Sequence, residues 1–108
     1  MRTSIEILSA SRNTNTSSIE AEIENTGSET VGDFEHTDVY LLTDGVPVHN
    51  SFGTGSGTWS IVSIQPDGIH PGYLDPGETM TIVVFYSGSS PDWMQITTST
   101  GVSDSVYL

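Results

Sequence analysis

Residues 79–86 have the sequence Thr79-Met80-Thr81-Ile82-Val83-Val84-Phe85-Tyr86. β-Branched and aromatic residues dominate this run, and these residue types are enriched in strands. Successive side chains alternate across a strand, so the apolar residues of this run fall on both of its faces. We therefore predict a central strand with apolar surroundings on both sides.

The rest of the chain consists of similar short, alternating runs bounded by Gly, Pro, Asn, Asp and Ser. Such runs cover residues 3–10, 17–25, 37–43, 46–48, 58–64, 93–98 and 102–108, and residues 31–35 form a connection or a short edge strand. Turn signals about every 8–12 residues are typical of sandwiches. We predict an all-β fold, an immunoglobulin-like β-sandwich of seven to eight mostly antiparallel strands. With 108 residues the chain has room for one domain, residues 1–108.

Two runs predict which side chains face the core. In residues 17–25, Ile19, Ala21 and Ile23 point one way, and three glutamates point the other way toward solvent. The turn that follows contains Gly27, which we expect to supply a positive φ.

The run that begins at residue 58 is expected to place Trp59, Ile61 and Ser63 on one face. Pro47 has no N–H group to donate to a ladder, so the run 46–48 is expected at a sheet edge.

The charge balance limits the classes of partner. The chain has fourteen Asp and Glu, two Arg and no Lys, and its net charge is −12. Nucleic-acid binding needs clustered cations to neutralise phosphates, and an anionic lipid surface repels such a domain. The acidity fits either a salty habitat, where self-repulsion is screened, or a cationic partner.

Catalytic and cofactor motifs are absent from the sequence. The three histidines are scattered, no cysteine or lysine is present, and no serine lies in a G-x-S-x-G motif. We expect no enzyme activity, no cofactor and no metal centre. Asp75 and Glu78 are weak calcium candidates, and we favour a role for both in fixing the turn before residue 79.

One modification motif is present. Asn15-Thr16-Ser17 matches the N-glycosylation sequon and lies at a predicted hairpin tip. Asn15 is therefore a glycosylation candidate.

Several segments, in a fixed order, resemble one family. They are Arg2 to Ala10, Asn25-Thr26-Gly27-Ser28, Thr37-Asp38-Val39, Asp44-Gly45, Trp59, Leu74-Asp75-Pro76-Gly77-Glu78 and Thr100 to Asp104. Together they resemble the soluble domain of the F-type accessory proteins of the archaellum, the archaeal swimming filament, which have a sister G type. The resemblance spans nearly the whole chain.

The resemblance implies a location and partners. It implies an extracytoplasmic sandwich between the cell membrane and the surface layer, where it anchors the static part of the motor. The expected partners are the surface-layer protein, the sister accessory protein, and further copies in a homodimer or hetero-oligomer. The family's N-terminal apolar helix is missing before Met1, and we expect that it was removed. A filament subunit head domain and a calcium- or carbohydrate-binding envelope module are the alternatives.

Candidate contact residues follow from this interpretation. For protein binding they are Phe34, Phe52, Tyr73, Leu74 and Trp93. For self-association they are Tyr40, Leu42, Val83 and Phe85, taken as one sheet face, although these four side chains could equally belong to the core of the domain.

Overall fold

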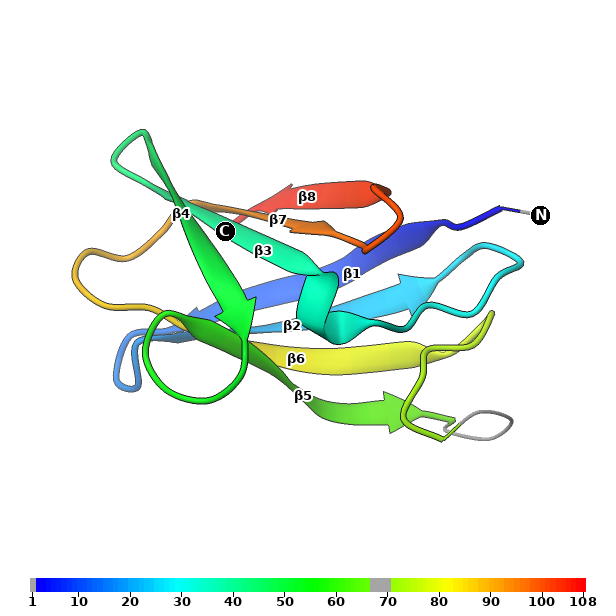
Figure 1. Cartoon of the computed structure of the whole chain (residues 1–108). Coiled ribbons are helices and arrows are strands. Elements are labelled where there is room, and N and C mark those ends of the chain that lie inside the picture. Colours follow the sequence, from blue (N-terminus) through cyan, green and yellow to red (C-terminus); the bar gives the residue numbers. More distant parts are fainter. Residues whose placement is uncertain (1, 67–70) are drawn as a thin grey trace.

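The computed structural model describes residues 2–66 and 71–108, and it is built almost entirely of strands (Figure 1). The elements are β1 (Ile5–Asn13), β2 (Ser18–Asn25), the 3-10 helix η1 (Phe34–His36), β3 (Asp38–Thr43), β4 (Val46–Phe52), β5 (Thr58–Gln65), β6 (Thr79–Phe85), β7 (Trp93–Thr97) and β8 (Ser103–Tyr107). The predicted all-β class is confirmed. No helix in the described part of the chain has the length and apolar character needed to cross a bilayer. His70 lies outside the described residues.

The strands follow the order β1-β2-β6-β5-β4-β3-β7-β8 in one folded-over sheet. All neighbours are antiparallel except β4 and β5, which pair in parallel only at Ser51 and Phe52. This short contact divides the sheet into two layers, β1-β2-β6-β5 and β4-β3-β7-β8. In Figure 1 the first layer lies below the second. On the opposite side, the Ile7 amide donates to Asp104 Oδ2 at 2.8 Å and links β1 to β8. The predicted sandwich is thus confirmed in a nearly closed form.

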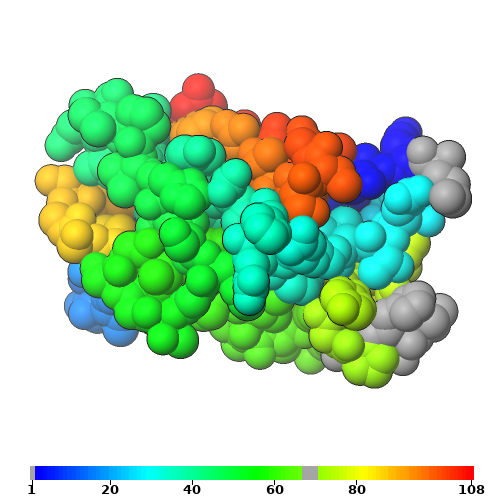
Figure 2. All heavy atoms as spheres, viewed as in Figure 1, coloured from blue at the N-terminus to red at the C-terminus, as the bar shows by residue number. Residues whose placement is uncertain are grey.

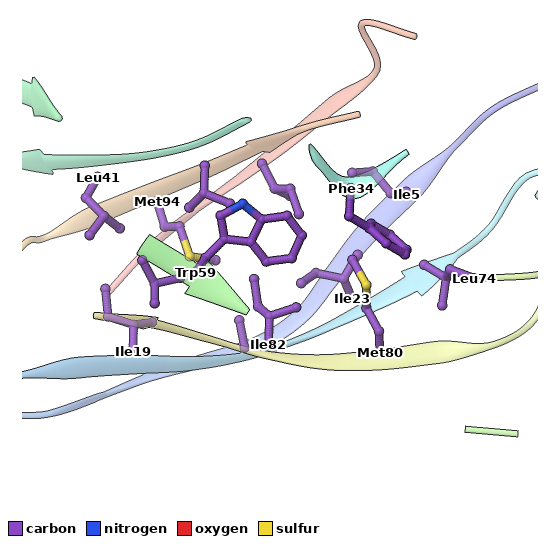
Figure 3. Packing of buried hydrophobic residues seen from close by; sticks show 14 of the residues in the cluster. Ile5, Ile19, Ile23, Phe34, Leu41, Trp59, Leu74, Met80, Ile82 and Met94 are labelled. Atoms are coloured by element: carbon purple, nitrogen blue, oxygen red, sulfur yellow. The ribbon is translucent and has the colours of Figure 1, made fainter. Parts of the chain in front are cut away.

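The core lies between the two layers and is centred on Trp59, which is 0% exposed (Figure 3). The side chains around Trp59 come from both layers, and Figure 3 labels Ile19, Ile23, Met80 and Ile82 from one and Leu41 and Met94 from the other. Phe34 of η1 packs edge-on against Trp59, with ring centroids 6.2 Å apart. Within the described residues, Trp59 Nε1 has no hydrogen-bond partner.

A β-bulge in β5 changes which side chains face this core. Ile61 pairs with Ile82, but the next pairs are Ser63 with Thr81 and Ile64 with Met80, so one residue is inserted between them. A bulge of this kind shifts the alternation by one residue. The prediction that Ser63 points inward with Trp59 is therefore wrong, and Ile64 takes that place.

The turn after β2 is tied together by Asn25, which is 1% exposed. Its Nδ2 donates to the carbonyl oxygens of Glu29 at 2.7 Å and of Leu74 at 2.8 Å, and its Oδ1 accepts from the Gly27 amide at 3.0 Å. Gly27 is not among the positive-φ residues, so the expected role of this glycine is wrong. A Cβ at Gly27 would lie 2.6 Å from the Ser4 amide nitrogen, and the glycine is required by this close approach.

The segment 31–35 is neither a full strand nor a simple connection. Val31 makes an isolated antiparallel bridge with Leu74, and η1 follows. The β3–β4 hairpin turns at Asp44 and Gly45, with φ of 51° and 80°. Positive φ at both central residues is the type I′ geometry that suits hairpins.

Candidate protein interface

The outer face of the β4-β3-β7-β8 layer carries a row of apolar side chains. Leu42 on β3 lies opposite Pro47 on β4 and Trp93 on β7, and Trp93 lies opposite Tyr107 on β8. Directly opposed residues of antiparallel strands share a face. Pro47 is exposed, Leu42 and Trp93 are half-buried, and Tyr107 is 84% exposed. We call these four residues the outer stripe; it crosses all four strands of the layer.

A more polar row runs beside the outer stripe. Tyr40 lies opposite His49 on one side and Gln95 on the other. The rings of Tyr40 and His49 are 5.1 Å apart, and His49 Nε2 is 2.7 Å from Asp38 Oδ1. An apolar centre with a polar flank is the usual make-up of a protein-binding surface.

The outer face of the other layer has a different chemistry. Glu20, Glu22 and Glu24 lie along β2, and Glu6 on β1 lies opposite Glu24. Ser9 donates to Glu22 Oε1 at 3.2 Å. The two outer faces therefore differ: one carries the outer stripe, and the other, called the acidic outer face, carries this group of glutamates.

Three of the candidate contact residues are exposed or half-buried. Trp93 belongs to the outer stripe, whereas Phe52 (38% exposed) and Tyr73 (49% exposed) lie elsewhere. Phe52 ends β4 and packs on Trp59 at 4.9 Å between ring centroids. In Figure 2 the side chains of β4 and the loop after it, in green, cover a broad part of the visible face. Tyr73 covers Gly32, where a Cβ would meet its ring at 2.7 Å.

The other two candidate contact residues are buried. Leu74 is 0% exposed because it bridges to Val31 and completes one end of the core. Phe34 is 9% exposed because η1 turns its ring onto Trp59. Neither side chain can serve as a contact on the free surface of the domain, and that part of the prediction is wrong.

The four self-association candidates do not form one face. Val39 and Leu41 on β3, and Ile82 and Val84 on β6, all point into the shared core. Successive side chains of a strand alternate, so the neighbours of these core residues point outward. Tyr40 and Leu42 point outward from the layer of β3, and Val83 and Phe85 from the opposite layer, which contains β6. Of the four, Leu42 belongs to the outer stripe and Tyr40 lies beside it.

Asp75 and Glu78 are buried in the turn before β6. The Asp75 amide donates to Glu78 Oε1 at 2.9 Å, and Thr30 Oγ1 donates to Asp75 Oδ1 at 2.6 Å. The Glu78 amide donates to the Asp75 carbonyl at 2.9 Å, which closes the turn. In residues 2–66 and 71–108 no three His, Asp or Glu side chains form a group able to hold a metal ion.

The two described histidines each contact a carboxylate. His36 Nδ1 is 2.7 Å from Asp33 Oδ1, and this hydrogen bond raises the pKa of His36 above its ordinary value of 6.5. The negative charge of Asp33 adds to the same effect. Both side chains are exposed at η1 and lie apart from the outer stripe.

Tyr107 and Pro47 were not anticipated as surface candidates. The sequence of residues 102–108 carries a signal, because the apolar residues Val102, Val106 and Leu108 alternate with Ser103, Ser105 and Tyr107. That pattern alone would place Tyr107 outward. Its contact with Trp93 depends on the pairing of β7 with β8, which no local pattern encodes.

Comparison with known proteins identifies solved structures with this fold, and two of them are described here. Neither a scan of protein-family models nor a search of curated proteins gave a match. The archaellum periplasmic stator protein FlaG from Sulfolobus acidocaldarius superposes with a TM-score of 0.77 at 22% identity, over 99% of this chain and 100% of that one. A chain of the archaellum periplasmic stator complex of FlaF and FlaG, from the same organism, gives a TM-score of 0.76 at 24% identity, over 100% of this chain and 90% of that one. The chain thus has, over its whole length, the fold of these archaellum stator proteins.

Proposed function

We propose that this chain is a non-enzymatic protein-binding domain of the static part of an archaellum motor, held outside the cell membrane. One observation carries the proposal: the FlaG likeness covers 99% of this chain and 100% of the other. The likeness therefore includes every strand of the sandwich and not only a part of it. The segments that resemble the archaellum accessory proteins in sequence lie along this same fold.

The outer stripe is the proposed contact with the sister accessory subunit. The solved FlaF–FlaG complex is an assembly of two such proteins, which supports a sister subunit as the partner. Aromatic side chains near the centre of an interface contribute most of the binding free energy, and the stripe presents Trp93 and Tyr107 side by side. Polar neighbours such as His49 and Asp38 would form the rim.

Charge favours a partner other than a second copy. Each domain has a net charge of −12, so two copies repel each other at low ionic strength. At about 1 M salt the Debye length is near 3 Å, and this repulsion is largely screened. A homodimer through the stripe should therefore need high salt, whereas a partner with a cationic rim should bind best at low salt.

Binding of the sister subunit can be tested directly. The sister accessory protein from the same genome would be titrated against the purified chain by calorimetry at several salt concentrations. We expect Trp93→Ser and Tyr107→Ser to weaken binding at least about tenfold, which corresponds to roughly 1.4 kcal/mol. Val83→Ser, on the acidic outer face, is the matched control and should bind like the parent chain. Equal affinities for all three variants would exclude the stripe as the interface.

Anchoring to the surface layer is the second part of the proposal. A stator subunit needs an attachment to a fixed structure as well as to its own assembly. Phe52 and Tyr73 are exposed candidates outside the stripe, and they are the proposed contacts with the surface layer. Surface-layer protein presented to the immobilised domain should bind saturably, and Phe52→Ser or Tyr73→Ser should weaken that binding. Absence of saturable binding across salt and pH would contradict the anchor while leaving the sister contact intact.

A further inference from the structure

Asn15 lies at the tip of the β1–β2 hairpin, beside a pocket that is separate from the outer stripe. We infer that Asn15 carries an N-linked glycan whose first sugar lies in this pocket. The inference rests on the proposed function in one respect, because such glycans are attached outside the cytoplasm.

The four asparagines of the chain differ in a way that singles out Asn15. Asn25 and Asn50 are each 1% exposed, and their carboxamides are hydrogen-bonded. Asn13 is exposed, but the residue two positions after it is Asn15 rather than Ser or Thr. Only Asn15 combines exposure with a hydroxyl residue, Ser17, at the position that the sequon requires.

The carboxamide of Asn15 is available for modification. Its backbone N–H donates to Asn13 Oδ1 at 3.0 Å, and this bond shapes the tip without using the Asn15 side chain. Within the described residues the Asn15 side chain makes no hydrogen bond. Ser17 has a φ of 51°, and its carbonyl accepts from the Tyr86 amide at 3.0 Å, so the sequon is presented on a fixed turn.

The adjacent pocket has a lining suited to a sugar. Its volume is about 290 Å³, and its walls are Thr16, Ser17, Gly55, Ser56, Phe85 and Tyr86. This volume is close to the lower limit of roughly 300 Å³ for ligand pockets, which are typically lined by aromatic groups with a few polar ones. Hydroxyl groups can bond the sugar hydroxyls, while an aromatic ring packs against the C–H groups of the sugar ring.

The pocket is formed by segments that are held to each other. The Gly57 amide donates to the Phe85 carbonyl at 2.9 Å, which fixes the loop after β4 against the end of β6. The hydrogen bond between Tyr86 and Ser17 fixes the hairpin tip against the same strand end. Thr16 and Ser17 are both sequon residues and pocket walls, so the attachment point at Asn15 is one residue away from the pocket lining in the chain.

The chemical step is a glycosyl transfer from a lipid-phosphate-linked oligosaccharide. A bond forms between Asn15 Nδ2 and the anomeric carbon of the first sugar, and the bond from that carbon to the lipid phosphate oxygen breaks. The phosphate leaves with the bonding electron pair, and the proton lost from Nδ2 passes to solvent. No oxidation or reduction takes place.

Mass spectrometry of the full chain made in an archaeal host with its own N-glycosylation machinery tests the modification. We expect a glycan mass on the peptide that contains Asn15, and we expect complete loss of it in Asn15→Gln and in Ser17→Ala. Asn13→Gln, next to the sequon but outside it, should keep the glycan. Unmodified Asn15 in chain recovered from outside the cytoplasm overturns the inference.

Two further measurements separate this inference from the proposed function. Asn15→Gln should bind the sister subunit like the parent chain, because the hairpin belongs to the layer opposite the outer stripe. Recovery of the chain only from the cytoplasm would overturn both proposals, whereas intact sister binding by an unmodified extracytoplasmic chain overturns the glycan alone. In the glycosylated protein, nuclear Overhauser effects from the first sugar to the Phe85 ring support its place in the pocket, and their absence overturns that placement.

Discussion

Replacement of Asn25 tests whether the turn after β2 is held by its carboxamide. Asn25→Ala removes three hydrogen bonds, to the carbonyls of Glu29 and Leu74 and from the Gly27 amide. At about 0.5–1.5 kcal/mol net for each bond, the loss is roughly 1.5–4.5 kcal/mol. The Leu74 carbonyl keeps a second donor, the Val31 amide at 2.8 Å, which argues against a larger figure. This loss is a large fraction of the roughly 5–15 kcal/mol stability of a typical domain.

Asn25→Asp is the sharper variant because it keeps the shape of the side chain. A carboxylate oxygen would replace Nδ2 and face two carbonyl oxygens at 2.7 and 2.8 Å, with no donor between them. Burial beside these two carbonyl oxygens should raise the pKa of the new carboxyl above the ordinary value of about 3.9, although the Gly27 amide still donates to its other oxygen. The folded state then binds a proton that the unfolded state has lost, so stability falls as pH rises from the unfolded pKa through the folded pKa.

Urea unfolding at pH 7 and at pH 4 measures both effects, with an unchanged m-value as the criterion that the denatured state is the same. The matched control is Asn15→Asp, which adds the same charge at an exposed position. We expect Asn25→Asp to be much less stable than Asn15→Asp at pH 7 and to regain part of the difference at pH 4. Asn25→Ala within about 0.5 kcal/mol of the parent chain, the size of an ordinary surface effect, would refute the reasoning.

Three other perturbations have defined outcomes. Trp59→Ala should lower the free energy of unfolding in urea by about 3–5 kcal/mol. Trp59→Phe should lower it much less, because it keeps an aromatic ring and removes an N–H that lacks a partner. Equal losses for the two variants would contradict this. Gly27→Ala should cost about 1–3 kcal/mol by overpacking the N-terminal segment, and a stabilised variant would show that the close approach is relieved at no cost. The pKa of His36, followed by NMR, should lie above 6.5 and fall in Asp33→Asn. The stabilisation from this pair is present below the unfolded pKa of His36 and disappears as pH rises through the raised one, so a pKa unaffected by Asp33→Asn would exclude the pair as its cause.

Much of the fold could be predicted from local patterns. The alternation of Ile19, Ala21 and Ile23 against glutamates identified the buried face of β2 correctly, because the two-residue period is a property of the extended backbone itself. Asp44-Gly45 marked the β3–β4 hairpin for the same kind of reason, since its backbone angles suit those residues. The turn before β6 was also assigned its structural role, which the buried Asp75 and Glu78 now explain.

The candidate surface was less predictable. Leu74 and Phe34 lie in segments with loop-like composition, and only the packing of those segments over the core decides that both side chains are buried. Phe52 and Tyr73 occur in similar surroundings in the sequence and remain exposed. Burial of a loop side chain depends on which distant strands lie beneath it, and composition does not encode that.

The sequence by itself determined the strand pattern, the acidity and the position of the sequon, because each depends on residues close together in the chain. The tertiary structure alone decided the register and the two outer faces. The bulge that turned Ser63 outward, and the alignment of Leu42, Trp93 and Tyr107 into one stripe, arise from hydrogen bonds between strands far apart in sequence. The register of such pairing is set by the need to bury Trp59 and its neighbours in one core. That requirement involves all the strands together, so no single stretch of the sequence reveals it.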